Sequence, residues 1–200
     1  MDTDKNETET SYQVTLVEHS SSSYSPRTYD NAHLSDLTIA FALDFSTAGE
    51  RCTLKAAGNK YVAVPLTWNA ERSAQHIGKH IFESGAKRLN IAGNGIYTLG
   101  HYGYTQQVTN QKVYDVLKLV LKSHEILEIR SGGQTGVDLS ALVAGMALKV
   151  KSIGLFPKGF RQRLDDGVDY SRDPDAIYNE LVSFIYELTR EGDNLEHNTG

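Results

Sequence analysis

The chain has 200 residues and a net charge of −5; 40% of its residues are hydrophobic and 22% are charged. This is the composition of an ordinary globular protein of one domain, and it excludes a chain that is mainly disordered. The single cysteine, Cys52, excludes an intrachain disulfide framework and a zinc cluster made of cysteines alone. No run of about 18 apolar residues and no signal-peptide pattern occurs, so we expect a cytoplasmic protein without a membrane partner.

The negative charge is concentrated at the two ends of the sequence. Residues 1–10 and residues 191–200 each sum to −3, which leaves residues 11–190 at +1. A nearly neutral body lacks the positive field that nucleic acids attract, so bulk DNA or RNA is not an expected partner. Because both ends are polar and have no apolar period, we expect disordered tails at 1–11 and 190–200 around a single domain at 12–189.

Short apolar runs and helical patterns alternate along this domain. Six segments have the character of strands: residues 12–18, 37–43, 61–66, 89–92, 126–129 and 153–156. Apolar residues recur at helical spacing between them, and a last amphipathic helix is expected at 173–189. The alternation predicts a doubly wound α/β fold, with a mainly parallel, Rossmann-like sheet and an added C-terminal helix. The apolar face of that helix either seals the core or forms a homo-oligomer.

A glycine-rich motif follows residues 126–129. It reads Ser131-Gly132-Gly133-Gln134-Thr135-Gly136-Val137-Asp138, and an amphipathic helix comes directly after it. Glycines allow close backbone approach and the free N–H groups of a helix start favour an anion, so the motif is expected to hold a phosphate. The alternative is a plain turn in which Thr135 and Asp138 form a capping box. Position alone leaves Asp138 open between a cap, a contact to a ribose hydroxyl and a contact to a cation.

Other loops are expected at the same edge of the sheet, because such folds bind ligands beyond the carboxyl ends of their strands. Residues 44–53 lead into a short helix, where Thr47 and Glu50 fit a capping box and Glu50 is otherwise a candidate catalyst. Cys52, in that helix, is expected to be a packed residue rather than a nucleophile. The loop after residues 153–156 contributes the cations Lys158 and Arg161, which suit a phosphate.

Two further features carry weaker signals. Gly93-Asn94-Gly95 is permissive backbone that either approaches a ligand or makes a turn. His76 and His80 are four residues apart on one helix without a third ligand nearby in the sequence, so no metal site is expected. No cofactor is indicated.

The glycine motif, with Pro157-Lys158-Gly159 and Asp165-Asp166-Gly167 downstream, resembles that of the molybdenum carrier family. This family belongs to a Rossmann-like superfamily that includes the cytokinin-activating phosphoribohydrolases and DNA-processing protein A. The resemblance covers about residues 12–167 and implies a nucleotide-binding site, while the family's name also implies molybdate as a cargo. Where the family has a Gly-Gly-Thr type of phosphate turn, this chain has Ala48-Gly49-Glu50, a departure that argues against catalysis and does not affect the expectation of binding.

The order of the matching segments implies a circular permutation. In the family the glycine motif comes near the N-terminus, whereas here the segments that resemble the rest of the domain come first. The joint is expected near residues 124–125. Residues 48–49 and 132–136 should then lie at the carboxyl ends of near-adjacent parallel strands, and Tyr12 should lie close to Gly167.

Three functions fit the sequence. The first is a sensor or sequestering protein that binds a small nucleotide or nucleotide-derived phosphate ligand. The second is a hydrolase of the N-glycosidic bond of nucleoside monophosphates, with Glu50 and Asp138 as the catalytic candidates. The third is an interaction scaffold with a vestigial cleft. The candidate ligand-binding residues are Arg27, Asn31, Ser46, Thr47, Gly49, Asn94, Gly132, Gly133, Gln134, Thr135, Gly136, Asp138, Lys158 and Arg161.

Overall fold

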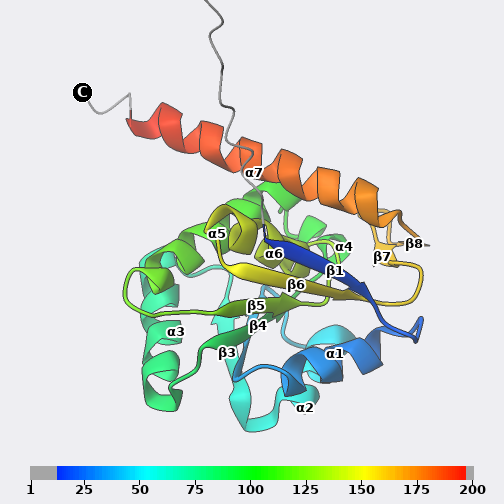
Figure 1. Ribbon diagram of the computed structural model, residues 1–200, viewed down its shortest axis with the longest axis horizontal. Coiled ribbons are helices and arrows are strands. Elements are labelled where there is room, and N and C mark those ends of the chain that lie inside the picture. Colours follow the sequence, from blue (N-terminus) through cyan, green and yellow to red (C-terminus); the bar gives the residue numbers. More distant parts are fainter. Residues whose placement is uncertain (1–12, 197–200) are drawn as a thin grey trace, which may run out of the picture.

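Six parallel strands form the centre of the molecule (Figure 1). The structure is a computed structural model that describes residues 13–196, with side chains as far as residue 188. Across the sheet the strands are ordered β1-β6-β5-β4-β2-β3, and every neighbouring pair is parallel. In chain order they are β1 Val14–Glu18, β2 Leu37–Ala42, β3 Tyr61–Pro65, β4 Arg88–Gly93, β5 Glu128–Ser131 and β6 Lys151–Phe156. The predicted α/β fold with a parallel sheet is confirmed, whereas the predicted tail at 1–11 lies outside the described residues.

Helices cover both faces of this sheet. They are α1 Tyr24–His33, α2 Ala48–Ala57, α3 Ala70–Ser84, α4 Ile96–Gly100, α5 Gln106–Leu121, α6 Val137–Ala147 and α7 Pro174–Glu196, with a short 3₁₀ turn η1 at Gly58–Lys60. Helix α1 packs against α2, while α5 packs between α3 and α6 in a separate layer. All six residues of β2 are buried, as expected of a central strand that has no solvent face.

Three elements have no counterpart among the predicted ones: α1, α4 and a hairpin of β7 Gln162–Arg163 with β8 Asp169–Tyr170. The buried residues of α1 are Arg27, Asn31 and Ala32, so this helix lacks the apolar period that marks a helix in a sequence. Each hairpin strand is two residues long, too short to show alternation. All three elements border the cleft described below.

The core is continuous through α6 to the C-terminal helix. Every residue from Val137 to Met146 is buried, because α6 is enclosed by the sheet, α5 and α7. The apolar face of α7, with Ile177, Leu181 and Phe184, packs on that helix and on Phe156. Helix α7 therefore seals the core of its own chain. It runs to Glu196, past residue 189 where the sequence predicts its end.

The predicted convergence of two loops at one edge is confirmed. Residues 132–136 follow β5 and residues 48–49 open α2 after β2, and only β4 lies between these two parallel strands. The circular permutation stays a prediction, and Tyr12, which was expected near Gly167, lies outside the described residues. Within residues 13–196, no helix combines the length and the hydropathy that a transmembrane span requires.

Replacing Leu181 by Ala tests whether α7 belongs to the core. The Leu181 side chain is fully buried, so Leu181→Ala should lower the free energy of unfolding by about 2–5 kcal/mol. The exposed Asn179 on the same helix is the control, and Asn179→Ala should change stability by no more than about 0.5 kcal/mol. Urea denaturation measures both, and equal stabilities of the two variants would contradict the packing of α7.

Candidate functional site

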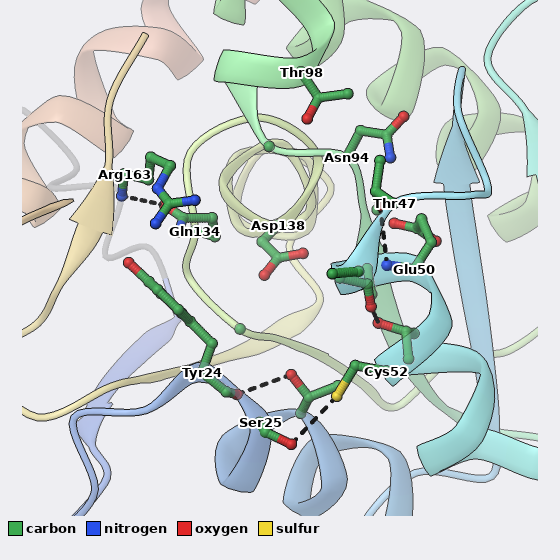
Figure 2. Close-up of a pocket in the computed structure, with 18 of the residues that line it drawn as sticks. Tyr24, Ser25, Thr47, Glu50, Cys52, Asn94, Thr98, Gln134, Asp138 and Arg163 are labelled. Atoms are coloured by element: carbon green, nitrogen blue, oxygen red, sulfur yellow. Dashed lines mark hydrogen bonds between the residues drawn. The ribbon is translucent and has the colours of Figure 1, made fainter. Parts of the chain in front are cut away.

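A cleft of about 540 Å³ opens at the carboxyl ends of β2, β4 and β5 (Figure 2). From β2 the chain continues to β3 on one side of the sheet, whereas from β4 it continues to β5 on the other, so the cleft lies where the strand order reverses. Open α/β sheets bind their ligands at this position, and the volume suits a small molecule. The cleft is lined by Tyr24, Ser25, Arg27, Thr28, Asn31, Thr47, Ala48, Gly49, Glu50, Cys52, Thr53, Asn90, Ala92, Gly93, Asn94, Gly95, Tyr97, Thr98, Gly132, Gln134, Asp138 and Arg163.

The sequence-predicted site residues divide into two groups. Those that line the cleft are Arg27, Asn31, Thr47, Gly49, Glu50, Asn94, Gly132, Gln134 and Asp138. Those that do not line it are Ser46, Gly133, Thr135, Gly136, Lys158 and Arg161. The second group includes most of the glycine turn and both cations that were expected to hold a phosphate.

The glycine turn is used for close packing and not as an open cradle. Gly133 has a φ of +69°, and a Cβ added to it would overlap the ring of Phe156, so this residue faces the core. The N–H of Gly136 donates to Gln106 Oε1 (2.6 Å) and the N–H of Val137 donates to the carbonyl of Asn94 (3.1 Å). These amides at the start of α6 already have partners within the protein.

The alternative interpretation of this turn as a capping box is wrong. Helix α6 is preceded by Gly136 at its N-cap, which has no side chain to cap with. The hydroxyl of Thr135 instead donates to the carbonyl of Arg163, and the carboxylate of Asp138 accepts a hydrogen bond from Arg27. Thr135 therefore fixes the β7–β8 hairpin to the glycine turn, and the carboxylate of Asp138 interacts with Arg27 and with the backbone N–H groups of Gln134 and Gly93.

A buried ion pair stands at the centre of the cleft. Arg27 Nη1 lies 3.3 Å from Asp138 Oδ2, and both side chains are buried. Burial raises the pKa of Asp138 above its ordinary value, while the positive charge of Arg27 acts in the opposite direction. Gly132 makes the contact sterically possible, since a Cβ there would overlap the guanidinium of Arg27.

A second carboxyl group, that of Glu50, lines the same cleft. Its side chain is buried, and the hydroxyl of Tyr61 lies 3.4 Å from Oε2 and donates to it. Burial, and then the negative charge of Asp138, raise the pKa of Glu50 to about 8, so that it is largely protonated at neutral pH. The predicted capping box is half correct, because Thr47 Oγ1 accepts from the N–H of Glu50 (3.2 Å) while the carboxyl group bonds to Tyr61 instead.

Two cleft-lining side chains of α1 carry buried polar atoms without a hydrogen-bond partner. These are both amide atoms of Asn31, which is 1% exposed, and Nε of Arg27. Asn94 behaves differently. Its Oδ1 accepts from the N–H groups of Leu43 and Asp44 (2.9 and 3.0 Å), so its amide holds the loop after β2 in place.

The cation that lines the cleft beside Arg27 is Arg163 of the hairpin, which the sequence interpretation missed. Arg161 pairs with Asp169 at 2.8 Å and stays outside the lining. No sequence signal separates Arg163 from Arg161, because strand β7 is only two residues long and the burial of Gln162 is known only from the structure.

Cys52 belongs to α2, and His76 and His80 belong to α3. Cys52 is partly exposed, lines the cleft and lies 3.4 Å from Ser25 Oγ, so it is not a packed core residue. Within residues 13–188 no cluster of three or more His, Cys, Asp or Glu side chains is placed to hold a metal ion. His76 and His80 pack edge to face with each other, and His76 with Trp68.

A scan against protein-family models finds no family that matches this chain, and a search of curated proteins finds no match either. The resemblance to the molybdenum carrier family therefore stays a prediction.

The raised pKa of Glu50 predicts a specific pH dependence of stability. Between the ordinary value of 4.5 and about 8, the folded protein binds the proton of Glu50 more tightly than the unfolded chain does. The free energy of unfolding should therefore fall as the pH rises through this window, by up to about 1.4 kcal/mol per pH unit. Glu50→Gln, which cannot ionise, should lack this loss.

Urea denaturation of the wild type and Glu50→Gln from pH 5 to pH 8 measures the effect. The stability difference between the two proteins should grow in favour of the variant as the pH rises. Parallel pH profiles would show that the pKa of Glu50 is not raised.

Proposed function

We propose that the cleft binds a small nucleotide or a nucleotide-derived phosphate ligand, as in a sensor or a sequestering protein. The observation that carries this proposal is the set of buried polar groups that line one cleft without sufficient partners. Buried polar atoms in proteins are nearly always hydrogen-bonded, and an unpaired one costs about 1–3 kcal/mol. Asn31 and Arg27 leave three such atoms at the wall of the cleft.

The chemistry of these groups suits the sugar of a nucleotide. Asp138 accepts hydrogen bonds, the protonated carboxyl of Glu50 both donates and accepts, and so does the amide of Asn31. Ribose hydroxyls are donors and acceptors at once, so they can satisfy all three. The rings of Tyr24 and Tyr97 line the same cleft and offer stacking surface for a base. The resemblance of the glycine motif points to the same class of ligand.

Asn31→Leu separates a role in binding from a role in folding. Leu has the same number and branching of side-chain heavy atoms as Asn and removes two unpaired polar atoms, so the free energy of unfolding should stay equal or rise by up to about 2 kcal/mol. Ligand binding should weaken about tenfold or more, because the hydrogen bonds to the amide are lost.

The measurement is titration calorimetry with adenosine, guanosine, cytidine and uridine 5′-monophosphates and with ADP-ribose. Ser35→Ala is the matched control, since Ser35 Oγ is also buried and unpaired but does not line the cleft. It should leave binding unchanged. If no compound binds to the wild type, the proposed function is wrong.

The second candidate, hydrolysis of the N-glycosidic bond of a nucleoside monophosphate, is favoured by the state of Glu50. A carboxyl group that keeps its proton near pH 7 can act as a general acid, and Asp138 beside Arg27 can stabilise the oxocarbenium-like sugar. Glu50 gives its proton to the base as the bond between the base and C1′ breaks, water adds to C1′, and the proton that the water loses restores Glu50.

Incubation with the four monophosphates tests this candidate by chromatography of free base and ribose 5-phosphate. Hydrolysis by the wild type should fall by a factor of about 100 or more in Glu50→Gln, because general acid catalysis is removed. Nucleotides recovered intact from the wild type would contradict hydrolysis and leave binding as the function.

A further inference from the structure

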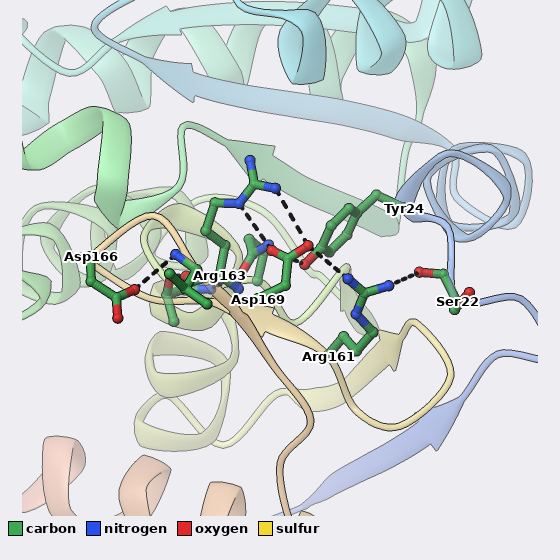
Figure 3. Close-up of polar contacts among 9 residues, drawn as sticks. Ser22, Tyr24, Arg161, Arg163, Asp166 and Asp169 are labelled. Atoms are coloured by element: carbon green, nitrogen blue, oxygen red, sulfur yellow. Dashed lines mark hydrogen bonds and ion pairs between the residues drawn. The ribbon is translucent and has the colours of Figure 1, made fainter.

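The β7–β8 hairpin brings two arginines to one carboxylate at the edge of the cleft (Figure 3). Asp169 Oδ2 lies 2.8 Å from Arg161 Nη2, and Asp169 Oδ1 lies 2.9 Å from Arg163 Nε. The hydroxyl of Tyr24 also donates to Oδ1 (2.9 Å). Two guanidinium groups share a single negative charge here, so the cluster has an excess charge of +1. Burial by itself would raise the pKa of Asp169, but the hydrogen bonds from Arg163 and Tyr24 have the larger combined effect and lower it. Asp169 is therefore ionised at neutral pH.

The two arginines differ in how they are held. Arg161 also donates to the carbonyl of Ser22 (3.3 Å), and its side chain is 34% exposed and absent from the lining of the cleft. Arg163 donates to both oxygens of Asp169, through Nε (2.9 Å) and Nη2 (3.4 Å), but it lines the cleft and its side chain is 48% exposed. The accessible cation is therefore that of Arg163.

The backbone of Arg163 is fixed although its guanidinium group is accessible. Its N–H donates to Gln134 Oε1 (2.6 Å), and its carbonyl accepts from the hydroxyl of Thr135. Both contacts tie the residue to the turn after β5. Because they use main-chain atoms of Arg163, they survive a change of its side chain.

The charges along the cleft are unevenly distributed. In Figure 2, Arg163 and Gln134 lie on one side of Asp138, and Glu50 and Thr47 lie on the other. The guanidinium of Arg27 is already neutralised by Asp138, whereas Arg163 shares Asp169 with Arg161. A ligand with an anionic group thus has one favourable orientation.

We propose that Arg163 recognises the phosphate group of the ligand, and that the ligand is a phosphomonoester of the nucleoside 5′-monophosphate type. This inference rests on the proposed function. Because Nε of Arg163 already donates to Asp169, the phosphate contacts Arg163 through its Nη groups, and the sugar hydroxyls point toward Asp138 and Glu50. Asp169 meanwhile retains Arg161 and Tyr24 as partners, so exchanging Arg163 leaves no buried charge unpaired.

The test compares nucleosides with their 5′-monophosphates. Adenosine, guanosine, cytidine and uridine and the four monophosphates are titrated by calorimetry into the wild type, Arg163→Gln and Arg161→Gln. We expect the wild type to bind a monophosphate more tightly than its nucleoside. Arg163→Gln should weaken the monophosphate about tenfold and leave the nucleoside unchanged, because a partly exposed charge-assisted bond is lost. Arg161→Gln removes the excess positive charge but keeps the guanidinium that contacts the phosphate, so it should weaken the monophosphate by less than Arg163→Gln does.

Other outcomes overturn the inference. If Arg163→Gln weakens nucleoside and monophosphate equally, Arg163 contacts the base or the sugar. If the wild type binds both equally, the cleft has no phosphate subsite.

A base-independent probe separates this inference from the proposed function. Inorganic phosphate at millimolar concentration should raise the melting temperature of the wild type and not that of Arg163→Gln, even if no nucleotide in the panel binds. That result would disprove the nucleotide class and retain Arg163 as an anion site. If phosphate leaves the melting temperature unchanged and no nucleotide binds, both the proposed function and the anion site at Arg163 are disproved.

Discussion

The ion pair between Arg27 and Asp138 is the constraint on which the site depends. A carboxylate buried at the start of α6 is strongly destabilising without a partner, and its partner comes from α1, which follows β1 more than one hundred residues earlier. The two side chains meet because Gly132 has no Cβ to keep them apart. The contact links α1 to the carboxyl edge of the central strands and thereby forms one wall of the cleft.

The same pair sets the charge pattern around it. The charge of Asp138 contributes to the raised pKa of Glu50, whose burial is the larger cause, so the cleft contains one neutral and one paired carboxyl group. On the other side, Asp169 gathers Tyr24 of α1 with the two arginines of the hairpin. Tyr24 and Arg27 are one turn apart on α1, so a single helix connects the acidic and the basic parts of the site.

The glycine motif lies at the predicted edge of the sheet, but its residues make contacts that the sequence did not predict. Its position after β5 places it at the carboxyl edge of the sheet, as strand periodicity predicted. Its residues, however, serve different purposes: Gly133 packs on Phe156, Gly136 bonds to Gln106, and Gly132 and Asp138 face the cleft. A turn sequence indicates which backbone conformations are allowed, but it does not reveal which neighbours will occupy its N–H groups.

By itself the sequence determined the strands, the helices with an apolar period and the edge at which the loops converge, because hydrophobic periodicity is local and parallel strands share a direction. Helix α1 was not predicted from the sequence, because two of its three buried residues, Arg27 and Asn31, are polar and give no apolar period. Only the tertiary structure decided that Arg27 contacts Asp138 and that Glu50 is buried close enough for the charge of Asp138 to affect it. It also decided that Arg163, and neither Lys158 nor Arg161, lines the cleft. Each of those facts depends on contacts between distant segments, which sequence spacing does not encode.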